Sequence, residues 1–184
     1  MAAPRRRWAA ELLHVWFHRL RPRQWFAPDP AVDALLRRRF ARELQALRTR
    51  PPAEFLSDPQ TALAAVLLFD QLPRNLYRGT RRAFATDRLA RAIAKGAMAR
   101  GWDATLTRVE RQFLAMPLMH SEAIADQRRS LEVFARLGPR HGWPFARSHY
   151  RMIARFGRFP HRNAVLGRRS TAAEVAAVEA GNRW

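Results

Sequence analysis

The chain has 184 residues, of which 48% are hydrophobic, so it has enough apolar material for one domain with a buried core and is not a disordered chain. Cysteine is absent, which excludes disulfides, thiolate metal sites and thiol nucleophiles. The formal net charge of +19 would allow nucleic-acid binding, but nearly all of it is arginine spread along the chain, which favours a solvated surface.

The first predicted helix covers residues 8–20. Trp8, Leu12 and Trp16 recur on one face at helical spacing. Polar residues at 11, 14 and 18 interrupt the apolar run that a signal peptide requires, so we expect an amphipathic helix and a cytoplasmic protein. No membrane span is predicted, because the longest apolar run, 62–69, is much shorter than a bilayer requires.

The next helices carry their own start signals. Asp29-Pro30 and Asp58-Pro59 each combine an N-cap residue with a proline at the first helical position. They predict one helix from 30 to about 48 and another over 59–72, which Pro73 ends. A fourth helix covers roughly 83–99.

Capping boxes open two of the later helices. Thr107-x-x-Glu110 starts a helix that breaks at Pro117, and Thr171-x-x-Glu174 starts a last short helix to about 180. Between them, helices are predicted over 121–137 and 144–156.

These elements predict an all-α fold. We expect a single domain over 1–184, with its core at about 8–180, made of about eight short helices. The helices fall into antiparallel pairs, namely 59–72 with 83–99, 107–116 with 121–137, and 144–156 with 171–180. Such pairs are typical of an α-solenoid.

Two similar motifs stand far apart, "FDQLPRN" at 69–75 and "FGRFPHRN" at 156–163. One interpretation is structural: each proline ends a buried helix, and the asparagine that follows takes a left-handed backbone. Arg74 and Arg162 would then interact with the last carbonyls of the two helices.

The other interpretation is functional: the two helix exits lie close together and present polar side chains to one cavity. Guanidinium groups bind carboxylate or phosphate through paired hydrogen bonds. The candidate ligand-binding residues are Arg74, Asn75, Arg78, Arg158, Arg162, Asn163 and Arg168. Asp70 lies beside apolar residues and needs a cationic partner, so it either holds an arginine in place or acts as a base.

His120 and Glu122 form a third polar group, after Pro117. They are either a loop histidine and a first-turn glutamate that the helix dipole stabilises, or an acid/base histidine beside a carboxylate. The candidate catalytic residues are therefore Asp70, His120, Glu122 and His161.

Glu11, His14 and His18 would share one helix face, as ligands do in carboxylate-bridged metal bundles. Such a bundle needs a second helix of the same kind, and the sequence has none. No metal and no other cofactor is predicted.

Three segments together resemble a known family: 69–87, 110–122 and 155–174. With the Trp-Phe pairs at 16–17 and 25–26, they are similar to the bacterial family of unknown function numbered 924, over roughly 11–178. The resemblance implies a tetratricopeptide-like α-solenoid and supplies no catalytic assignment. The chain departs from the family in its high arginine content and in His14 and His18, where an acidic residue and a glycine are expected.

The leading functional hypothesis is a concave helical domain that binds a small anionic ligand; whether it turns the ligand over is left open. The alternative is a protein-interaction module that holds a protein partner in the concave face of the solenoid. Nucleic-acid binding through the basic surface is the third. The sequence does not fix an oligomeric state.

Overall fold

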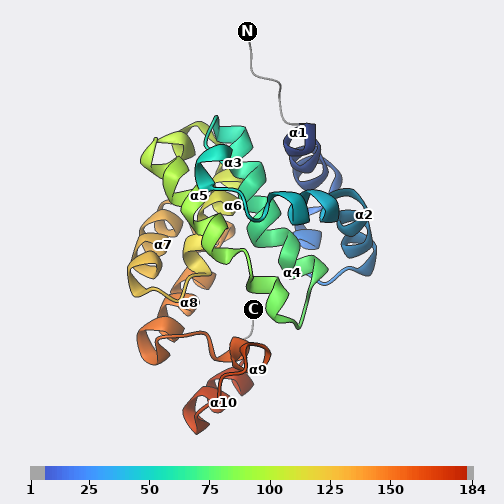
Figure 1. Ribbon diagram of the computed structural model, residues 1–184. Coiled ribbons are helices and arrows are strands. Elements are labelled where there is room, and N and C mark those ends of the chain that lie inside the picture. Colours follow the sequence, from blue (N-terminus) through green and yellow to red (C-terminus); the bar gives the residue numbers. More distant parts are fainter. Residues whose placement is uncertain (1–6, 182–184) are drawn as a thin grey trace.

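In the computed structural model, which describes residues 7–181, every regular element is a helix (Figure 1). The α-helices are α1 Arg7–His14, α2 Pro30–Leu47, α3 Pro59–Val66, α4 Leu72–Leu76, α5 Asp87–Ala99, α6 Arg108–Met119, α7 Ile124–Leu137, α8 Trp143–Phe156, α9 Asn163–Leu166 and α10 Ala172–Glu179. The 3₁₀ turns are Pro22–Trp25, Pro52–Phe55, Arg81–Phe84, Trp102–Thr105, Pro139–His141 and Pro160–Arg162, and two π-helical segments cover Val15–Arg19 and Leu67–Gln71. The predicted all-α class is confirmed, whereas the tetratricopeptide-like description stays a prediction.

Four of the predicted helix starts are confirmed by their caps, whereas the helices predicted from 83 and 121 begin at Asp87 and Ile124. Asp29 Oδ1 accepts hydrogen bonds from the first backbone N–H groups of α2, at 3.0 and 3.2 Å. Asp58 Oδ1 accepts the backbone N–H of Thr61 at 2.8 Å, at the start of α3. The capping box of Thr107 opens α6 and the box of Thr171 opens α10. These caps satisfy backbone donors that a helix start leaves unpaired.

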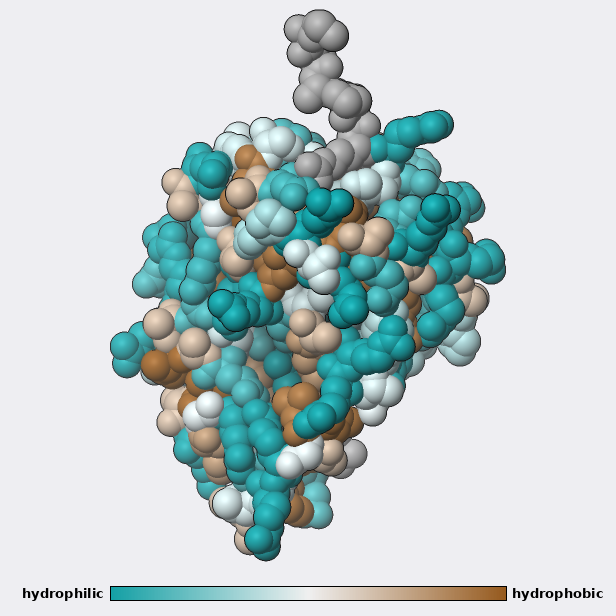
Figure 2. Space-filling model, viewed as in Figure 1, coloured by the Kyte–Doolittle hydropathy of each residue, from teal (hydrophilic) through white to brown (hydrophobic). Residues whose placement is uncertain are grey.

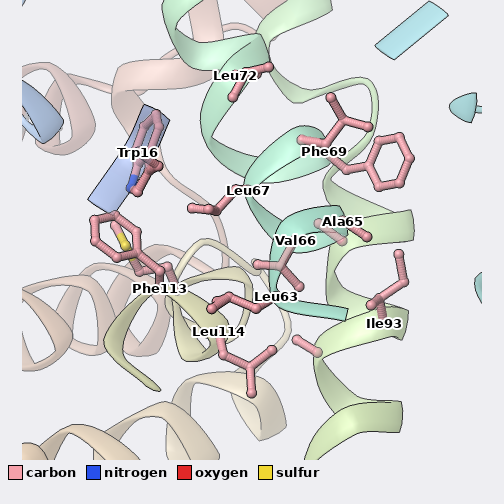
Figure 3. Packing of buried hydrophobic residues seen from close by; sticks show 14 of the residues in the cluster. Trp16, Leu63, Ala65, Val66, Leu67, Phe69, Leu72, Ile93, Phe113 and Leu114 are labelled. Carbon is pink, nitrogen blue, oxygen red and sulfur yellow. The ribbon is translucent and has the colours of Figure 1, made fainter. Parts of the chain in front are cut away.

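The core is built around α3 and the π-helical segment that follows it. All residues from Ala62 to Phe69 are fully buried, as expected of a helix that is apolar on every side. Figure 3 shows Leu63 and Val66 between Phe113 on one side and Ile93 on the other. No described helix combines the length and the apolar character needed to cross a bilayer.

Pro73 does not end its helix, so that prediction was wrong. Leu72 N–H donates to the carbonyl of Leu67, five residues earlier, and the chain continues through the π-helical segment into α4. Pro73 has no N–H for the carbonyl of Phe69, four residues earlier. That carbonyl accepts a 2.6 Å hydrogen bond from Thr86 Oγ1, which ties the start of α5 to this turn.

Two related predictions were also wrong. Pro117 lies inside α6 and does not break it. Asn75 lies within α4 and Asn163 begins α9 with right-handed backbone, and only glycines have positive φ among residues 7–181. The first motif is therefore a continuous helix, whereas the second begins a 3₁₀ turn after α8 has ended.

The predicted pairing is correct for α3 with α5 and for α6 with α7. The third pair was wrong, because α8 packs against α7 while α10 packs mainly against the turn Pro160–Arg162. In Figure 1, α9 and α10 lie at the end of the molecule away from α1.

Ion pairs hold the C-terminal segment against the connection between α6 and α7. Arg168 donates to both carboxylate oxygens of Glu122, at 2.8 and 2.9 Å, and Glu122 also accepts the backbone N–H of Phe159 at 2.8 Å. Arg158 makes a similar pair with Glu174 inside the segment, at 2.6 and 2.9 Å. These bonds fix the position of the turn that follows Phe159.

We expect Thr86→Val to lower the free energy of unfolding by about 1–3 kcal/mol, because it leaves the buried Phe69 carbonyl without its hydroxyl donor. The matched control is Thr80→Val, whose exposed hydroxyl bonds the carbonyl of Tyr77 and whose loss should cost less than about 0.5 kcal/mol. Urea denaturation measures both. Equal losses would contradict the role given to Thr86.

We expect Glu122→Gln to cost about 1–3 kcal/mol of unfolding free energy, because it weakens the charge-assisted bonds to Arg168. Protease cleavage within the C-terminal segment should accelerate as well, which mass spectrometry would locate. Glu132→Gln is the control, since it removes an exposed pair with Arg129 and should cost under about 1 kcal/mol. Cleavage at unchanged rates would show that Glu122 does not hold the segment.

Candidate functional site

The two motifs meet at a cavity of about 670 Å³. From the first motif and the residues just after it, Arg74, Asn75 and Arg78 line this cavity, and from the second, His161 and Arg162 do so. His120, from the end of α6, lines the same cavity. A smaller hollow of about 210 Å³ beside Tyr77 contains none of the candidate residues.

Asp70 and His120 form a pair at the wall of this cavity. His120 Nδ1 lies 2.8 and 3.0 Å from the two carboxylate oxygens of Asp70. Asp70 is fully buried, and the His120 side chain, which is 11% exposed, separates it from the cavity. The π-helical segment carries Asp70, and π turns inside α-helices are frequent at functional sites.

Asp70 is held as a carboxylate. Burial raises its pKa, but the positive charge of Arg74 and the contact with His120 outweigh burial and lower the pKa to about 2. Arg74 Nη1 lies 3.3 Å from Asp70 Oδ1, and the neighbouring Gln71 amide donates to the other carboxylate oxygen. A charged group without solvent is stable only with such partners.

His120 is held in one tautomer by Asp70. An ionised carboxylate only accepts hydrogen bonds, so Nδ1 carries the proton that is shared with Asp70, and Nε2 keeps its lone pair. Burial lowers the pKa of His120; Asp70 raises it, while Arg74 and Arg162 lower it further. The net pKa is below the ordinary histidine value, so His120 is neutral at neutral pH.

Asp87, at the start of α5, joins the two motifs. Arg74 donates to its two carboxylate oxygens at 2.9 and 3.0 Å, and Arg162 Nη1 lies 3.6 Å from the same carboxylate. Arg74 also donates to the backbone carbonyl of Asp70. Sequence reasoning missed Asp87 as a site residue; the signal available was its place in the first turn of a helix that follows the first motif closely.

Arg162 is a buried cation with uncommitted donors. Its guanidinium lies between the rings of Phe84 and Phe159, with Cζ 4.6 and 4.4 Å from their centres. Nη1 donates to the carbonyl of His120 at 3.1 Å. Within residues 7–181, Nε is buried without a hydrogen-bond partner and Nη2 makes no hydrogen bond either. Burial and the nearby Arg74 lower the pKa of Arg162 to about 10, so it remains charged at neutral pH.

Two further histidines border the cavity, and His149 was missed by sequence reasoning. Its ring centre is 6.2 Å from that of His120, and burial followed by the charge of His120 lowers its pKa to about 3. Burial and the charge of Arg162 lower the pKa of His161 to about 4. Both rings are therefore neutral at neutral pH.

Other candidate residues bond elsewhere. Glu122 and Arg168 pair with each other outside the cavity, and Arg158 pairs with Glu174. Asn163 donates to Ser170 Oγ and accepts from Arg168. The expectation that all the candidates present their side chains to one cavity was therefore wrong for Asp70, which lies behind His120, and for Glu122, Arg158, Asn163 and Arg168.

Asn75 and Arg78 line the cavity but are held by Asp33 of α2. Asn75 Nδ2 donates to Asp33 at 2.9 Å, and Arg78 donates to both of its oxygens at 3.1 and 2.9 Å. These bonds attach α2 to α4. They also leave fewer donors on Asn75 and Arg78 for a ligand.

The helix face that carries Glu11, His14 and His18 has other contacts. Glu11 pairs with Arg39 at 2.7 Å, and the rings of His14 and His18 stack with centres 5.7 Å apart. In the described part of the chain, no group of three or more histidines or carboxylates has metal-binding geometry.

The arrangement can perform two chemical tasks. His120 Nε2 can take or give a proton while Asp70 stabilises the ring, as in other histidine–carboxylate pairs. Arg162 can place hydrogen-bond donors and positive charge beside it. Both tasks concern the same wall of the cavity, because Arg162 binds the carbonyl of His120 itself.

Comparisons with known proteins confirm the family resemblance that the sequence motifs indicated. The family described as "Bacterial protein of unknown function (DUF924)" matches residues 12–182. Among solved structures, a protein of unknown function from Agrobacterium tumefaciens, ATU0120, is 38% identical, with a TM-score of 0.89 and coverage of 94% of this chain and 97% of that one. No curated protein matches the chain. The chain therefore belongs to the bacterial DUF924 family, whose function is unknown.

Proposed function

We propose that the protein binds a small anionic molecule in this cavity, with Arg162 as the anion-binding group and His120 as the acid/base group that acts on it. One observation carries the proposal: Arg162 is a buried cation whose Nε and Nη2 have no partners in the described structure. Buried charges in proteins are normally paired and hydrogen-bonded.

The charges around Arg162 support an anionic ligand. Asp87 is the nearest carboxylate, and its two oxygens already bind Arg74 at shorter distances. The charges of Asp87, Glu122 and Asp70 raise the pKa of Arg162, but burial and the charge of Arg74 outweigh them, so its positive charge is incompletely compensated. A carboxylate or phosphate group would supply both the missing charge and acceptors for planar guanidinium donors.

The roles of the other groups follow from their contacts. Arg74 is committed to Asp70 and Asp87, so it acts as a positioning residue rather than as part of the anion clamp. Asp70 fixes the tautomer of His120, and His120 Nε2 exchanges a proton with the ligand or with a water beside it. Arg168, bound to Glu122, stabilises the turn that carries Arg162.

The two alternative functions have their own tests. In Figure 2 the hydrophilic side chains are spread over the visible face, which matches a solvated polar surface. Nucleic-acid binding would show an affinity that falls steeply with salt. A protein-interaction module would be stabilised by a protein partner and by no small anion.

We expect small anions to stabilise the protein through Arg162. Acetate, succinate and inorganic phosphate are the probes, and the best of them should raise Tm by roughly 5–10 °C at a hundred times its Kd. Arg162→Gln should abolish the shift, while Arg162→Lys should keep only part of it because lysine lacks the planar fork. Differential scanning fluorimetry and calorimetric titration measure both effects.

The control is Arg136→Gln, which removes an exposed arginine of α7 outside the cavity and should leave the shift unchanged. Circular dichroism establishes that each variant is folded. If Arg162→Gln binds anions as the unsubstituted protein does, Arg162 is not the anion-binding group.

We expect Asp70→Asn to lower the pKa of His120 further. Asp70 is the charge that raises this pKa against burial and against two arginines, so its removal favours the neutral ring. An NMR titration of the histidine ring protons measures the change. The control is Asp33→Asn, which removes a carboxylate bonded to Arg78 and should leave the pKa of His120 unchanged. A higher or unchanged pKa in Asp70→Asn would exclude the proposed pairing.

A further inference from the structure

We propose that the ligand of this cavity is an amphipathic organic anion, with an anionic group at Arg162 and an unbranched apolar body that extends about 10 Å along α6. The inference rests on the proposed function and adds the chemical class of the ligand. It is carried by the distribution of apolar side chains in the cavity.

The cavity contains unusual exposed aromatic side chains. Four large hydrophobic residues are exposed among those described, and the two most exposed, Phe26 and Phe145 at 58% each, both line the cavity. Isolated exposed hydrophobics are normal, but aromatic side chains that converge on one cavity are typical of ligand sites. They come from distant parts of the chain: Phe26 directly follows the 3₁₀ turn Pro22–Trp25, and Phe145 lies in the first turn of α8.

The polar and apolar walls lie at different places along α6. Phe26 stacks on Phe113, with ring centres 6.0 Å apart and planes at 4°. Phe113 lies seven residues before His120 on the chain, which corresponds to about 10 Å along a helix. Arg162 binds the carbonyl of His120, so the charged end of the cavity is close to the end of α6.

A methionine lies between the charged end and the aromatic end of the cavity. Met116 lies on α6 between Phe113 and His120 and lines the cavity, and its sulfur is 3.7 Å from the Gln71 amide nitrogen that also faces Asp70. Methionine side chains adapt to apolar ligands of varied shape. A ligand anchored at Arg162 would therefore run past Met116 toward Phe26, with apolar contact along its length.

The buried charge of Arg162 at one end of the cavity excludes a purely apolar ligand. A simple inorganic anion would leave the apolar wall in water. An acyl or similar chain with one carboxylate or phosphate uses both walls.

The test is a homologous series of straight-chain carboxylates, butanoate, hexanoate and octanoate, titrated calorimetrically into the full chain. We expect affinity to rise by up to about fourfold per methylene, since each buried methylene contributes that much by transfer from water. Octyl phosphate tests whether the anionic group is a carboxylate or a phosphate. Octanamide, which has the chain without the charge, should bind at least tenfold more weakly than octanoate.

Two variants test the wall. Phe26→Ala and Phe145→Ala should each reduce the gain in affinity for every added methylene. Both positions are exposed enough for the fold to tolerate alanine. The matched control is Val175→Ala, an exposed apolar residue of α10 outside the cavity, which should keep the full gain.

The outcomes separate this inference from the proposed function. Equal affinities across the carboxylate series would overturn the amphipathic ligand and leave anion binding at Arg162 intact. Octanamide binding as tightly as octanoate would overturn anion binding and leave an apolar site. Absence of binding by every probe, or a chain-length gain that both phenylalanine variants retain, would overturn the inference.

Discussion

The buried carboxylate of Asp70 is the constraint on which the site depends. A negative charge in a fully buried position is stable only if neighbours compensate it, and here an arginine, a histidine and an amide do so. Each partner is thereby fixed in turn: Arg74 by its additional bonds to Asp87, and His120 in a single tautomer. Removing the carboxylate would leave the arginine, the histidine and the amide without the charge that holds them in place.

The backbone around Asp70 shows how this charge enters a core helix. The π turn and Pro73 both interrupt regular α-helical hydrogen bonding, and the carbonyl of Phe69 is satisfied by a side chain from another element. The irregular turn therefore links α4 to the start of α5, where Asp87 lies. In a regular α-helix without a proline at this turn, the carbonyl of Phe69 would be bonded within the helix and would not accept the hydroxyl of Thr86. The turn that carries Asp70 would then lack this hydrogen bond to the start of α5, where Asp87 lies.

Local signals predicted the parts of the fold that local chemistry decides. Asp29, Asp58 and the two threonine capping boxes give the helix starts, because a cap uses only neighbouring backbone groups. Pro73 was misjudged because a tertiary contact satisfies the carbonyl that it leaves unpaired, and Pro117 was misjudged because it is accommodated within α6. The sequence did allow the proximity of Arg74 and Arg162 to be predicted, because the repeated motif suggested that the two segments lie close together.

The rest of the site depends on distances that a sequence does not contain. Nothing local distinguishes Arg162, with its free donors, from Arg168, whose donors bind Glu122, Asn163 and the carbonyl of Phe159. Asp87 and His149 carry no motif of their own and become visible only when α5 and α8 are placed beside the end of α6. Side-chain partnership, rather than residue type, decides which arginine is available.

Arg162 comes late in the chain, while the Asp70–His120 pair lies entirely in earlier helices. During synthesis the pair can therefore form before the segment that carries Arg162 has docked, and the cavity at that stage lacks one wall. The same order applies to the finished protein. A local opening of the C-terminal segment, which costs less than global unfolding, would remove Arg162 from the cavity wall while the helical core stays intact. The lifetime of that docked state, rather than the stability of the core, then sets how long Arg162 stays beside His120.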